Sequence, residues 1–260
     1  MMAPEPVRLD AAFLRHPIAH RGLHDRASGR PENSMAAFAA AIDAGYGIEC
    51  DIQPSADGVA MVFHDYDLRR LTGKGGPITA MTAAELGAMP IHGSTETIPT
   101  LAALLQLVAG QVPLLIEIKD QDGAVGPKVG PLEEAVARDL SGYRGPVAVM
   151  SFNPYSVAAM ARLAPSVARG VTAGGPDDST YDGLSPERVA ALGDVTDYAG
   201  VGASFVSYDH KLLTRPAIAG LKARGAAILC WTIRSEAEEA RARKVAQNIT
   251  FENYLAKPVA

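Results

Sequence analysis

Four short clusters of ionisable residues each lie at the end of an apolar run that is typical of a β-strand. They are His20-Arg21-Gly22, Glu49-Cys50-Asp51, His64-Asp65 and Glu117-Ile118-Lys119. Side chains alternate along a strand, so Glu49 and Asp51 project to the same face and Cys50 to the other. Two neighbouring carboxylates repel each other unless a cation lies between them. The second cluster therefore indicates a cation site.

Glu117 and Lys119 repeat this spacing on a later apolar strand. One such pair alone could be a solvated strand face, but two pairs at the ends of apolar strands favour a metal site. Oxygen ligands of this kind are the ones that Mg²⁺ and Ca²⁺ prefer. We therefore expect Glu49, Asp51 and Glu117 to hold one divalent metal ion, either Mg²⁺ or Ca²⁺.

A predicted hairpin brings a histidine to the same place. The sequence Ser55–Gly58 is typical of a tight turn between two apolar runs. If its last two residues are the central residues of the turn, Asp51 and His64 lie directly opposite each other, with Cβ atoms about 5 Å apart. In that register His64 borders the expected metal site.

Two histidines at this place suit the cleavage of a phosphodiester. His20 ends the first predicted strand, so it is expected at the same end of the sheet as His64. One histidine can remove a proton from the nucleophile while the other protonates the leaving oxygen. Arg21 and Lys119 can hold phosphate oxygens, and Glu32 either braces Arg21 or faces the site. The other histidines are expected to be structural: His16, His24, His92 and His210.

The elements that must position these residues are short strands alternating with Ala-rich helices, the pattern of an α/β fold with a parallel sheet. Eight such units in about 250 residues are typical of a (β/α)8 TIM barrel, which carries its chemistry at the carboxyl ends of the strands. An open, doubly wound sheet is the alternative. The predicted strands are Pro17–His20, Tyr46–Asp51, Pro113–Lys119, Val147–Ser151, Ala168–Thr172, Ala203–Tyr208, Ala227–Thr232 and Asn248–Phe251.

The connection after the second strand is longer than the others. Beyond the hairpin strand Val59–His64, residues 73–99 are rich in Gly, Pro and Thr, so a small inserted lobe with one short helix at Ala83–Met89 is expected. Helices are predicted at Asn33–Gly45, capped by Asn33 or Ser34 and closed by Gly45, and at Leu101–Gly110. Residues 1–260 are expected to form a single domain.

The overall composition and net charge of the chain limit the kinds of molecule that it is expected to bind. The chain of 260 residues is 48% hydrophobic and 20% charged, with a net charge of −5, so nothing favours binding to nucleic acid or to an anionic membrane. An anionic small molecule would need a metal or a few placed cations. Cys50 and Cys230 lie in apolar runs, which is typical of buried thiols in a reducing compartment. With no signal peptide or transmembrane run in the sequence, we expect a cytoplasmic protein.

In their order and spacing the motifs resemble the glycerophosphodiester phosphodiesterase family. The resemblance covers residues 18–120 closely and the rest of the chain loosely. Its pieces are His20-Arg21-Gly22, Pro31-Glu32-Asn33-Ser34, Glu49-x-Asp51, Asp57-Gly58, His64-Asp65 and Glu117-Ile118-Lys119, with Ser151-Phe152 and Trp231-Thr232-Ile233 as weaker matches.

The resemblance implies a TIM barrel with a small lobe after the His-Asp pair, and hydrolysis of a glycerophosphodiester to glycerol 3-phosphate and an alcohol. In the family's usual account the substrate's own glycerol hydroxyl attacks first, through a cyclic phosphate, before water completes the hydrolysis. The resemblance implies His20 and His64 as the acid–base pair, with Arg21, Lys119 and Trp231 at the substrate. The implied metal ligands are again Glu49, Asp51 and Glu117.

The last third of the chain departs from the family's pattern. Arg234 stands where the family usually has Asn, and Glu252 lies where the closing strand usually runs into Thr-Asp and Pro. The two residues could pair with each other, or each could face the substrate's head group; a free Arg234 would disfavour cationic head groups. Two other functions stay open: lysophospholipase D-like hydrolysis, which exposed apolar residues on the lobe would favour, and a non-catalytic phosphate-binding barrel.

Overall fold

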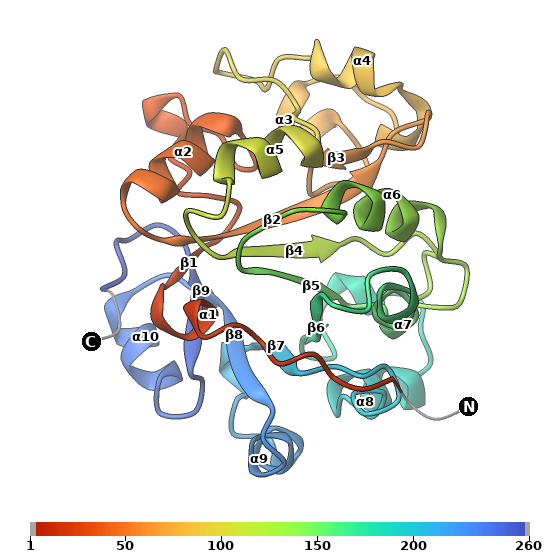
Figure 1. The fold of residues 1–260 in the computed structure, drawn as a ribbon, viewed down its shortest axis with the longest axis vertical. Helices are drawn as coiled ribbons and strands as arrows, with labels where there is room; N and C mark the ends of the chain where they lie inside the picture. Colours follow the sequence, from red (N-terminus) through yellow and green to blue (C-terminus); the bar gives the residue numbers. More distant parts are fainter. Residues whose placement is uncertain (1–3, 258–260) are drawn as a thin grey trace.

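The structure is a computed structural model that describes residues 4–257. Within this range eight parallel strands form a closed barrel, because β1 pairs with both β2 and β9 (Figure 1). The TIM barrel predicted from the sequence is therefore confirmed and the open sheet is excluded. The barrel strands are β1 Ile18–Ala19, β2 Gly47–Pro54, β4 Leu114–Ile118, β5 Val147–Ser151, β6 Ala168–Ala173, β7 Phe205–Asp209, β8 Ala227–Ile233 and β9 Asn248–Phe251.

Helices surround the strands, and local sequence sets their ends. In α2, Ser34 caps the first turn by accepting from the Ala37 N–H, and Gly45 (φ 72°) ends the helix in the left-handed region, as expected. No helix within residues 4–257 is long and apolar enough to cross a membrane. The α-helices are α1 Ala12–Arg15, α2 Met35–Asp43, α3 Arg69–Thr72, α4 Ala83–Gly87, α5 Leu101–Val108, α6 Pro131–Leu140, α7 Pro154–Leu163, α8 Pro186–Gly193, α9 Pro216–Ala223 and α10 Glu236–Ala242.

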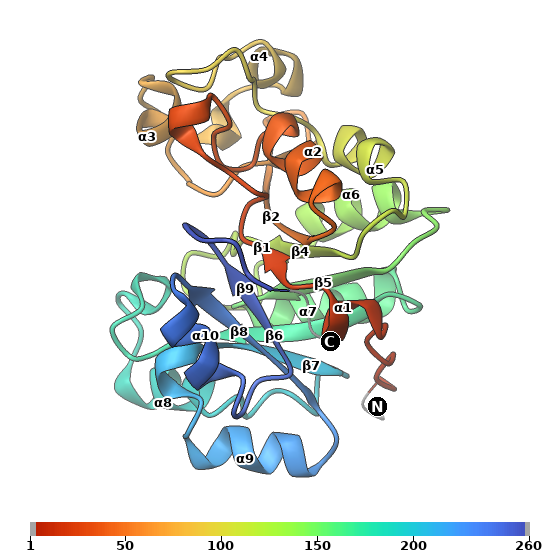
Figure 2. The same ribbon diagram turned by 90° about the vertical axis from the view of Figure 1, so that its left-hand side faces the viewer.

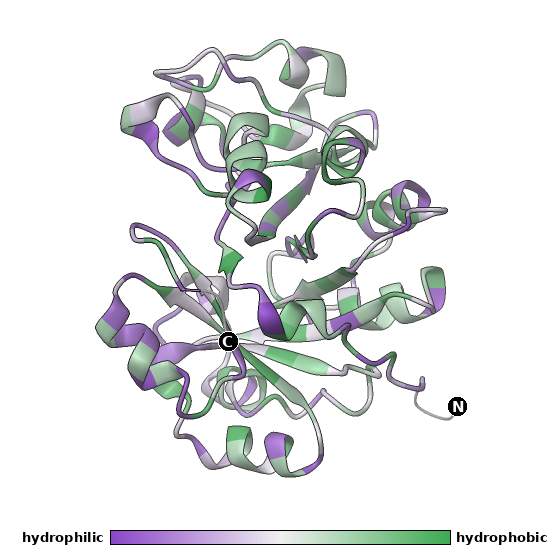
Figure 3. Cartoon of the chain, turned by 60° about the vertical axis from the view of Figure 1, so that its left-hand side comes forward, coloured by the Kyte–Doolittle hydropathy of each residue, from purple (hydrophilic) through white to green (hydrophobic). Residues whose placement is uncertain are grey.

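Two apolar layers hold the barrel. The outer layer lies between the strands and the helices and includes Cys50, which points away from the barrel interior. The inner layer fills the amino-terminal part of the barrel and includes Phe13 of α1, Leu115 of β4 and Phe205 of β7. Figure 3 shows the strands coloured mainly as hydrophobic and the helices with mixed faces. Since α1 closes the amino-terminal end of the strands, the opposite end is the one left for a site.

The inserted lobe has an apolar cluster of its own. It contains the short helices α3 and α4 and the 3-10 helix η2 (Ile78–Ala80), and it projects beyond the barrel above α2 (Figure 2). Burial of its apolar side chains is the main force that orders so short a segment. The cluster begins on the hairpin, before residue 73, and comprises Met61, Phe63, Leu68, Leu71, Ile78, Leu86, Met89, Ile91 and Ile98.

The predicted register of the hairpin is wrong by one residue. Strand β3 (Ala60–Val62) pairs antiparallel with β2, but Ile52 lies opposite Val62, and the Asp51 carbonyl accepts from the Phe63 N–H at 2.9 Å. The turn has three residues rather than two, because the Ser55 N–H bonds to the Val59 carbonyl, and Gly58 (φ 76°) supplies the left-handed position that such a loop requires. His64 therefore lies beyond the strand, one residue past the position opposite Asp51.

Candidate active site

A cavity of about 920 Å³ opens at the carboxyl ends of the barrel strands. Small-molecule sites in proteins commonly have volumes of this size. Each of the eight residues that the sequence analysis assigned to metal, catalysis or substrate lines this cavity: His20, Arg21, Glu49, Asp51, His64, Glu117, Lys119 and Trp231. The barrel thus brings together residues that are up to 211 positions apart.

Three carboxylates form the floor of the cavity. Glu49 and Asp51 lie on β2, Asp51 is in register with Glu117 on β4, and one oxygen from each carboxylate lies within 4.8 Å of the others. All three side chains are buried. Burial, and then the charges of Asp51 and Glu117, raise the pKa of Glu49 well above its ordinary value. Such crowded carboxylates fit a divalent cation, which would relieve their repulsion.

Two cations already lie against this group. The Lys119 ammonium is 2.8 Å from Asp51 Oδ1 and 2.5 Å from Glu117 Oε1. Burial works against the Lys119 charge, but Asp51 and Glu117 outweigh it and raise the lysine pKa above its ordinary value. The Arg21 guanidinium lies 3.3 Å from Asp51, while its backbone N–H donates to Glu49 at 2.9 Å. Three carboxylates thus face two cations.

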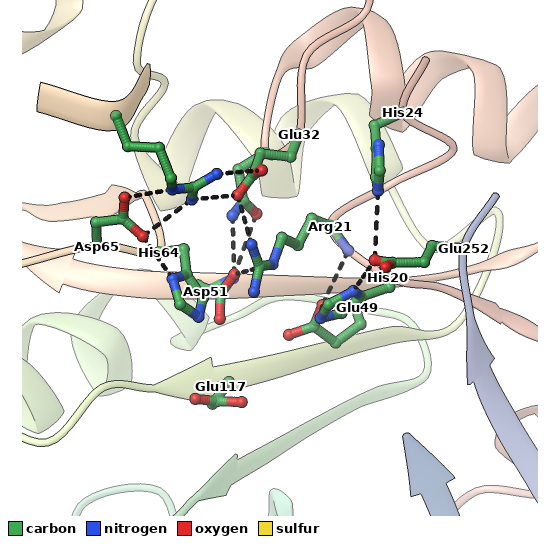
Figure 4. A network of polar contacts seen from close by, with 12 residues as sticks. His20, Arg21, His24, Glu32, Glu49, Asp51, His64, Asp65, Glu117 and Glu252 are labelled. Carbon is green, nitrogen blue, oxygen red and sulfur yellow. Dashed lines mark hydrogen bonds and ion pairs between the residues drawn. The ribbon is translucent and has the colours of Figure 1, made fainter. Parts of the chain in front are cut away.

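His64 is held from the lobe side of the cavity. Its Nδ1 is 2.7 Å from Asp65 Oδ1, and Arg70 donates to both oxygens of Asp65. Arg70 also donates to Glu32, which in turn accepts from Arg21 at 2.6 Å (Figure 4). Glu32 therefore braces Arg21, one of its two expected roles. This continuous chain of ion pairs fixes the two sides of the cavity relative to each other.

His20 lies on the opposite side of the carboxylates, beside Glu49. Its Nε2 is 4.0 Å from Glu49 Oε2, and its Nδ1 is 2.6 Å from Glu252 Oε2. Burial lowers the pKa of His20 to about 4, although the hydrogen bond to Glu252 acts in the other direction. The ring is therefore neutral near pH 7 in this structure, which is the form that can accept a proton.

The turn that carries His20 and Arg21 needs a glycine next to them. Gly22 has φ 79°, and a Cβ added there would lie 2.9 Å from both the Ala37 carbonyl carbon and Phe38 Cδ1. The strand end and α2 thus approach each other as closely as a glycine allows. This contact places the His20-Arg21 pair at the rim of the barrel.

Replacing Gly22 by alanine is expected to destabilise the protein twice over. The left-handed conformation costs a residue with a Cβ about 1–2 kcal/mol, and the clash with α2 adds a penalty of about 1–3 kcal/mol, as overpacking does. Gly29→Ala is the matched control, since Gly29 has φ 73° but a Cβ added there would meet no atom within 4 Å. Equal free energies of unfolding for the two variants, measured in urea, would contradict the close contact.

Aromatic side chains form the wall of the cavity beyond the histidines. The Trp231 indole is fixed by a hydrogen bond from Nε1 to the Ser207 carbonyl at 3.1 Å. Phe152 packs edge-on against it with ring centroids 5.6 Å apart, and Tyr181 packs behind Phe152. The wall is thus a rigid apolar surface facing the charged floor.

Comparisons with known proteins bear on this geometry. A family described as "Glycerophosphoryl diester phosphodiesterase family" matches residues 20–250. The chain is 30% identical over 233 residues to YhdW of Bacillus subtilis (strain 168), an alignment that covers 86% of this chain and 88% of YhdW. The chain belongs to the glycerophosphodiester phosphodiesterase family.

Other relatives agree with this membership. A glycerophosphodiester phosphodiesterase of Caldanaerobacter subterraneus subsp. tengcongensis is 31% identical over 163 residues, an alignment that covers 59% of this chain and 65% of that protein. A phosphodiesterase of Oleispira antarctica, solved in complex with the product sn-glycerol-3-phosphate, has a TM-score of 0.72 and 25% identity, with 94% of both chains covered. The glycerophosphodiester phosphodiesterase of Thermotoga maritima shares the fold, with a TM-score of 0.67 at 22% identity and coverage of 91% of this chain and 94% of that one.

The departures from the family's pattern lie together at the rim. Arg234 Nε is 2.7 Å from Glu252 Oε1, so the two residues pair with each other, which was one of the two expectations. The second oxygen of Glu252 bonds to His20, and His24 lies 3.7 Å away. The head-group side of the cavity therefore gains no unpaired cation from Arg234.

Sequence reasoning missed three contacts of this site. Arg70 belongs to none of the sequence motifs, yet it links Glu32 to Asp65. His24 was expected to be structural, and it lies beside the Glu252 carboxylate. The link from Glu252 to His20 had one signal in the sequence: in a closed barrel the last strand is next to the first, so the residues that follow them are neighbours.

Proposed function

We propose that this protein is a metal-dependent hydrolase that converts glycerophosphodiesters to glycerol 3-phosphate and an alcohol. The observation that carries the proposal is the group of three buried carboxylates within 4.8 Å, in a cavity lined by two histidines, in a member of this family. The relative from Oleispira antarctica, whose structure holds sn-glycerol-3-phosphate, supports the product.

Glu49, Asp51 and Glu117 would hold the divalent ion, Mg²⁺ or Ca²⁺. Their buried oxygens are hard ligands, and their charge exceeds that of the two neighbouring cations. When bound, such an ion supplies Lewis-acid polarisation of a phosphate oxygen and neutralises its charge. Arg21 and Lys119 face the same cavity and would orient the phosphate, with Trp231 packing against the substrate.

The two histidines divide the proton transfers. His20 is neutral and presents Nε2 to the cavity, so it would remove the proton from the attacking hydroxyl. His64, whose Nδ1 is engaged by Asp65, would donate a proton from Nε2 to the leaving alcohol oxygen. The phosphorus–oxygen bond to the alcohol then breaks as the new one forms, and the proton taken by His20 balances the proton given by His64. Where the attacking hydroxyl is that of the substrate's own glycerol, the product of this step is a cyclic phosphate. Water then opens the ring to glycerol 3-phosphate, with His64 taking the proton of the water and His20 returning its proton to the glycerol oxygen.

The structure gives no support to the lysophospholipid alternative. That function was to be favoured by exposed apolar residues on the lobe, but the large apolar residues there are buried in its own cluster, except Met81, which is partly buried against it. Between residues 4 and 257, the large hydrophobic residues that are exposed lie outside positions 73–99: Tyr66, Tyr155, Leu163 and Leu255.

We also propose that the lobe and the barrel act as one domain. The Tyr66 hydroxyl donates to the Asp120 carbonyl at 2.8 Å, and Glu96 accepts from the Ala36 N–H of α2 at 3.0 Å. Glu96 thus ties the lobe to α2, while Tyr66, in the segment that leads into the lobe, ties that segment to the loop after β4. Cys50 and Cys230 are free, buried thiols, which supports a reducing compartment such as the cytoplasm.

A coupled assay that measures the release of glycerol 3-phosphate from glycerophosphodiesters tests the function directly. Glycerol, ethanolamine and choline esters should all be hydrolysed, with activity lost in chelator and restored by Mg²⁺ or Ca²⁺. Because Arg234 is paired with Glu252, the choline ester should not be disfavoured relative to the glycerol ester. Hydrolysis of lysophosphatidylcholine alone would favour the lipid alternative, and binding of the esters without turnover would favour a non-catalytic barrel.

A further inference from the structure

One carboxylate at the rim, that of Glu252, contacts three ionisable side chains at once. Glu252 follows strand β9, and His20 follows strand β1. These two strands pair with each other, and the His20 N–H bonds to the Phe251 carbonyl at 2.9 Å. The Glu252 Oε2 is 2.6 Å from His20 Nδ1 and 3.7 Å from His24 Nε2 (Figure 4). The other oxygen, Oε1, is 2.7 Å from Arg234 Nε.

These contacts keep Glu252 ionised. Burial alone would raise its pKa, but the hydrogen bond from His20, the nearby His24 ring and the charge of Arg234 hold the pKa well below its usual range. An ionised carboxylate can only accept hydrogen bonds. The Nδ1 of His20 must therefore carry the hydrogen, which leaves Nε2 of a neutral ring free to accept a proton.

We propose that Glu252 is a positioning residue for His20: it selects the tautomer with hydrogen on Nδ1 and holds the ring with Nε2 toward the cavity. Arg234 holds Glu252 from the other side, so the two residues that depart from the family's pattern act as one unit. The inference rests on the catalytic role proposed for His20. Among the described residues, no other carboxylate lies within 3 Å of His20 Nδ1.

The position of Arg234 fits this role better than a role at the head group. Its side chain is half exposed, and the Nε that faces the barrel is committed to Glu252. Its backbone N–H is also fixed, by Glu238 Oε2 at 2.7 Å. A residue held at both its backbone and its side chain is suited to anchoring a neighbour.

The test compares Glu252→Ala with a matched control. Glu239 has the same side-chain exposure of 13% and a similar bond to an arginine, 2.6 Å to Arg243 Nε, but lies on α10 and contacts Tyr254 rather than His20. Glu252→Ala should lower kcat roughly 10–100-fold, the scale seen when the partner that orients a metal-bound histidine is removed, with KM little changed. Glu239→Ala should leave both constants near wild type.

A double-mutant cycle separates positioning from general support of the fold. In the His20→Ala background, Glu252→Ala should cause no further loss of kcat, because the residue that it orients is gone. An equal fold-loss in both backgrounds would overturn the proposal. Arg234→Asn should lower kcat less than Glu252→Ala does, since Glu252 keeps its bond to His20.

A measurement that does not depend on activity can test the positioning role of Glu252 separately from the proposed hydrolase function. ¹⁵N NMR of the histidine rings should show His20 with hydrogen on Nδ1 in the wild type and a mixture of tautomers in Glu252→Ala. A wild-type ring with hydrogen on Nε2, or an unchanged ring in the variant, would overturn the role of Glu252. If the esters are not hydrolysed but the tautomer responds to Glu252, the proposed function fails and the positioning contact stands.

Discussion

Replacing Glu49 by glutamine is expected to lower the activity by orders of magnitude while leaving the fold intact. Burial and the charges of Asp51 and Glu117 raise the pKa of Glu49, which means that the site without metal disfavours the charge of this carboxylate. A glutamine has a similar shape without that charge, and its side-chain oxygen can still accept the Arg21 N–H. The thermal midpoint in EDTA should therefore match that of the wild type.

The rise of the thermal midpoint with added metal should differ between the wild type and Glu49→Gln. A ligand that binds the folded state at 100 times its dissociation constant stabilises it by about 2.7 kcal/mol, so Mg²⁺ or Ca²⁺ should raise the wild-type midpoint. Glu49→Gln should need much more metal for the same shift and for partial recovery of activity. Glu133→Gln is the matched control, since Glu133 is equally buried, 1% exposed, but caps α6 far from the cavity. Full wild-type activity in EDTA after dialysis would contradict the metal site.

The barrel could be predicted because each of its strands is a short apolar run that can be recognised from neighbouring residues alone. Strands β5 and β9 begin and end where the sequence analysis placed them, since short apolar runs between turn residues leave little choice. Strand β2 runs three residues further than expected, to Pro54, because pairing with β3 extends it. Strand β7 starts two residues later, at Phe205, because the Ala203 N–H bonds back to the Tyr198 carbonyl and Ser204 lies at a bend.

The cavity-lining residues could also be predicted, and for a geometric reason. Parallel strands in a barrel all point their carboxyl ends at one mouth, so polar residues at strand ends meet there whatever their separation in sequence. Contacts within the mouth could not be predicted in this way. The hairpin register depended on whether the turn had two residues or three, and a single residue moved His64 past Asp51. Arg70 reaches Asp65 and Glu32 only through the path of the lobe.

His20→Ala and His64→Ala should each lose roughly 10²–10⁴ in kcat, the usual scale for groups that transfer protons. Neither ring is part of the apolar core, and Glu252 keeps Arg234 when His20 is removed, so both variants should fold and bind metal. His16→Ala is the control: His16 lies at the other end of β1, where its Nδ1 is 2.9 Å from the Gly45 carbonyl oxygen, and its loss should not affect turnover.

A change of leaving group should then tell the two histidines apart. A 4-nitrophenolate oxygen is stable as an anion and needs no proton as it departs, whereas the alkoxide of glycerol or choline does. If His64 is the acid, His64→Ala should regain most of its rate on a glycerophosphodiester of 4-nitrophenol. His20→Ala should remain slow on both substrates, because the attacking hydroxyl still has to lose its proton. Recovery of His20→Ala instead would reverse the two roles, and near wild-type turnover of either variant on the natural esters would make that histidine structural.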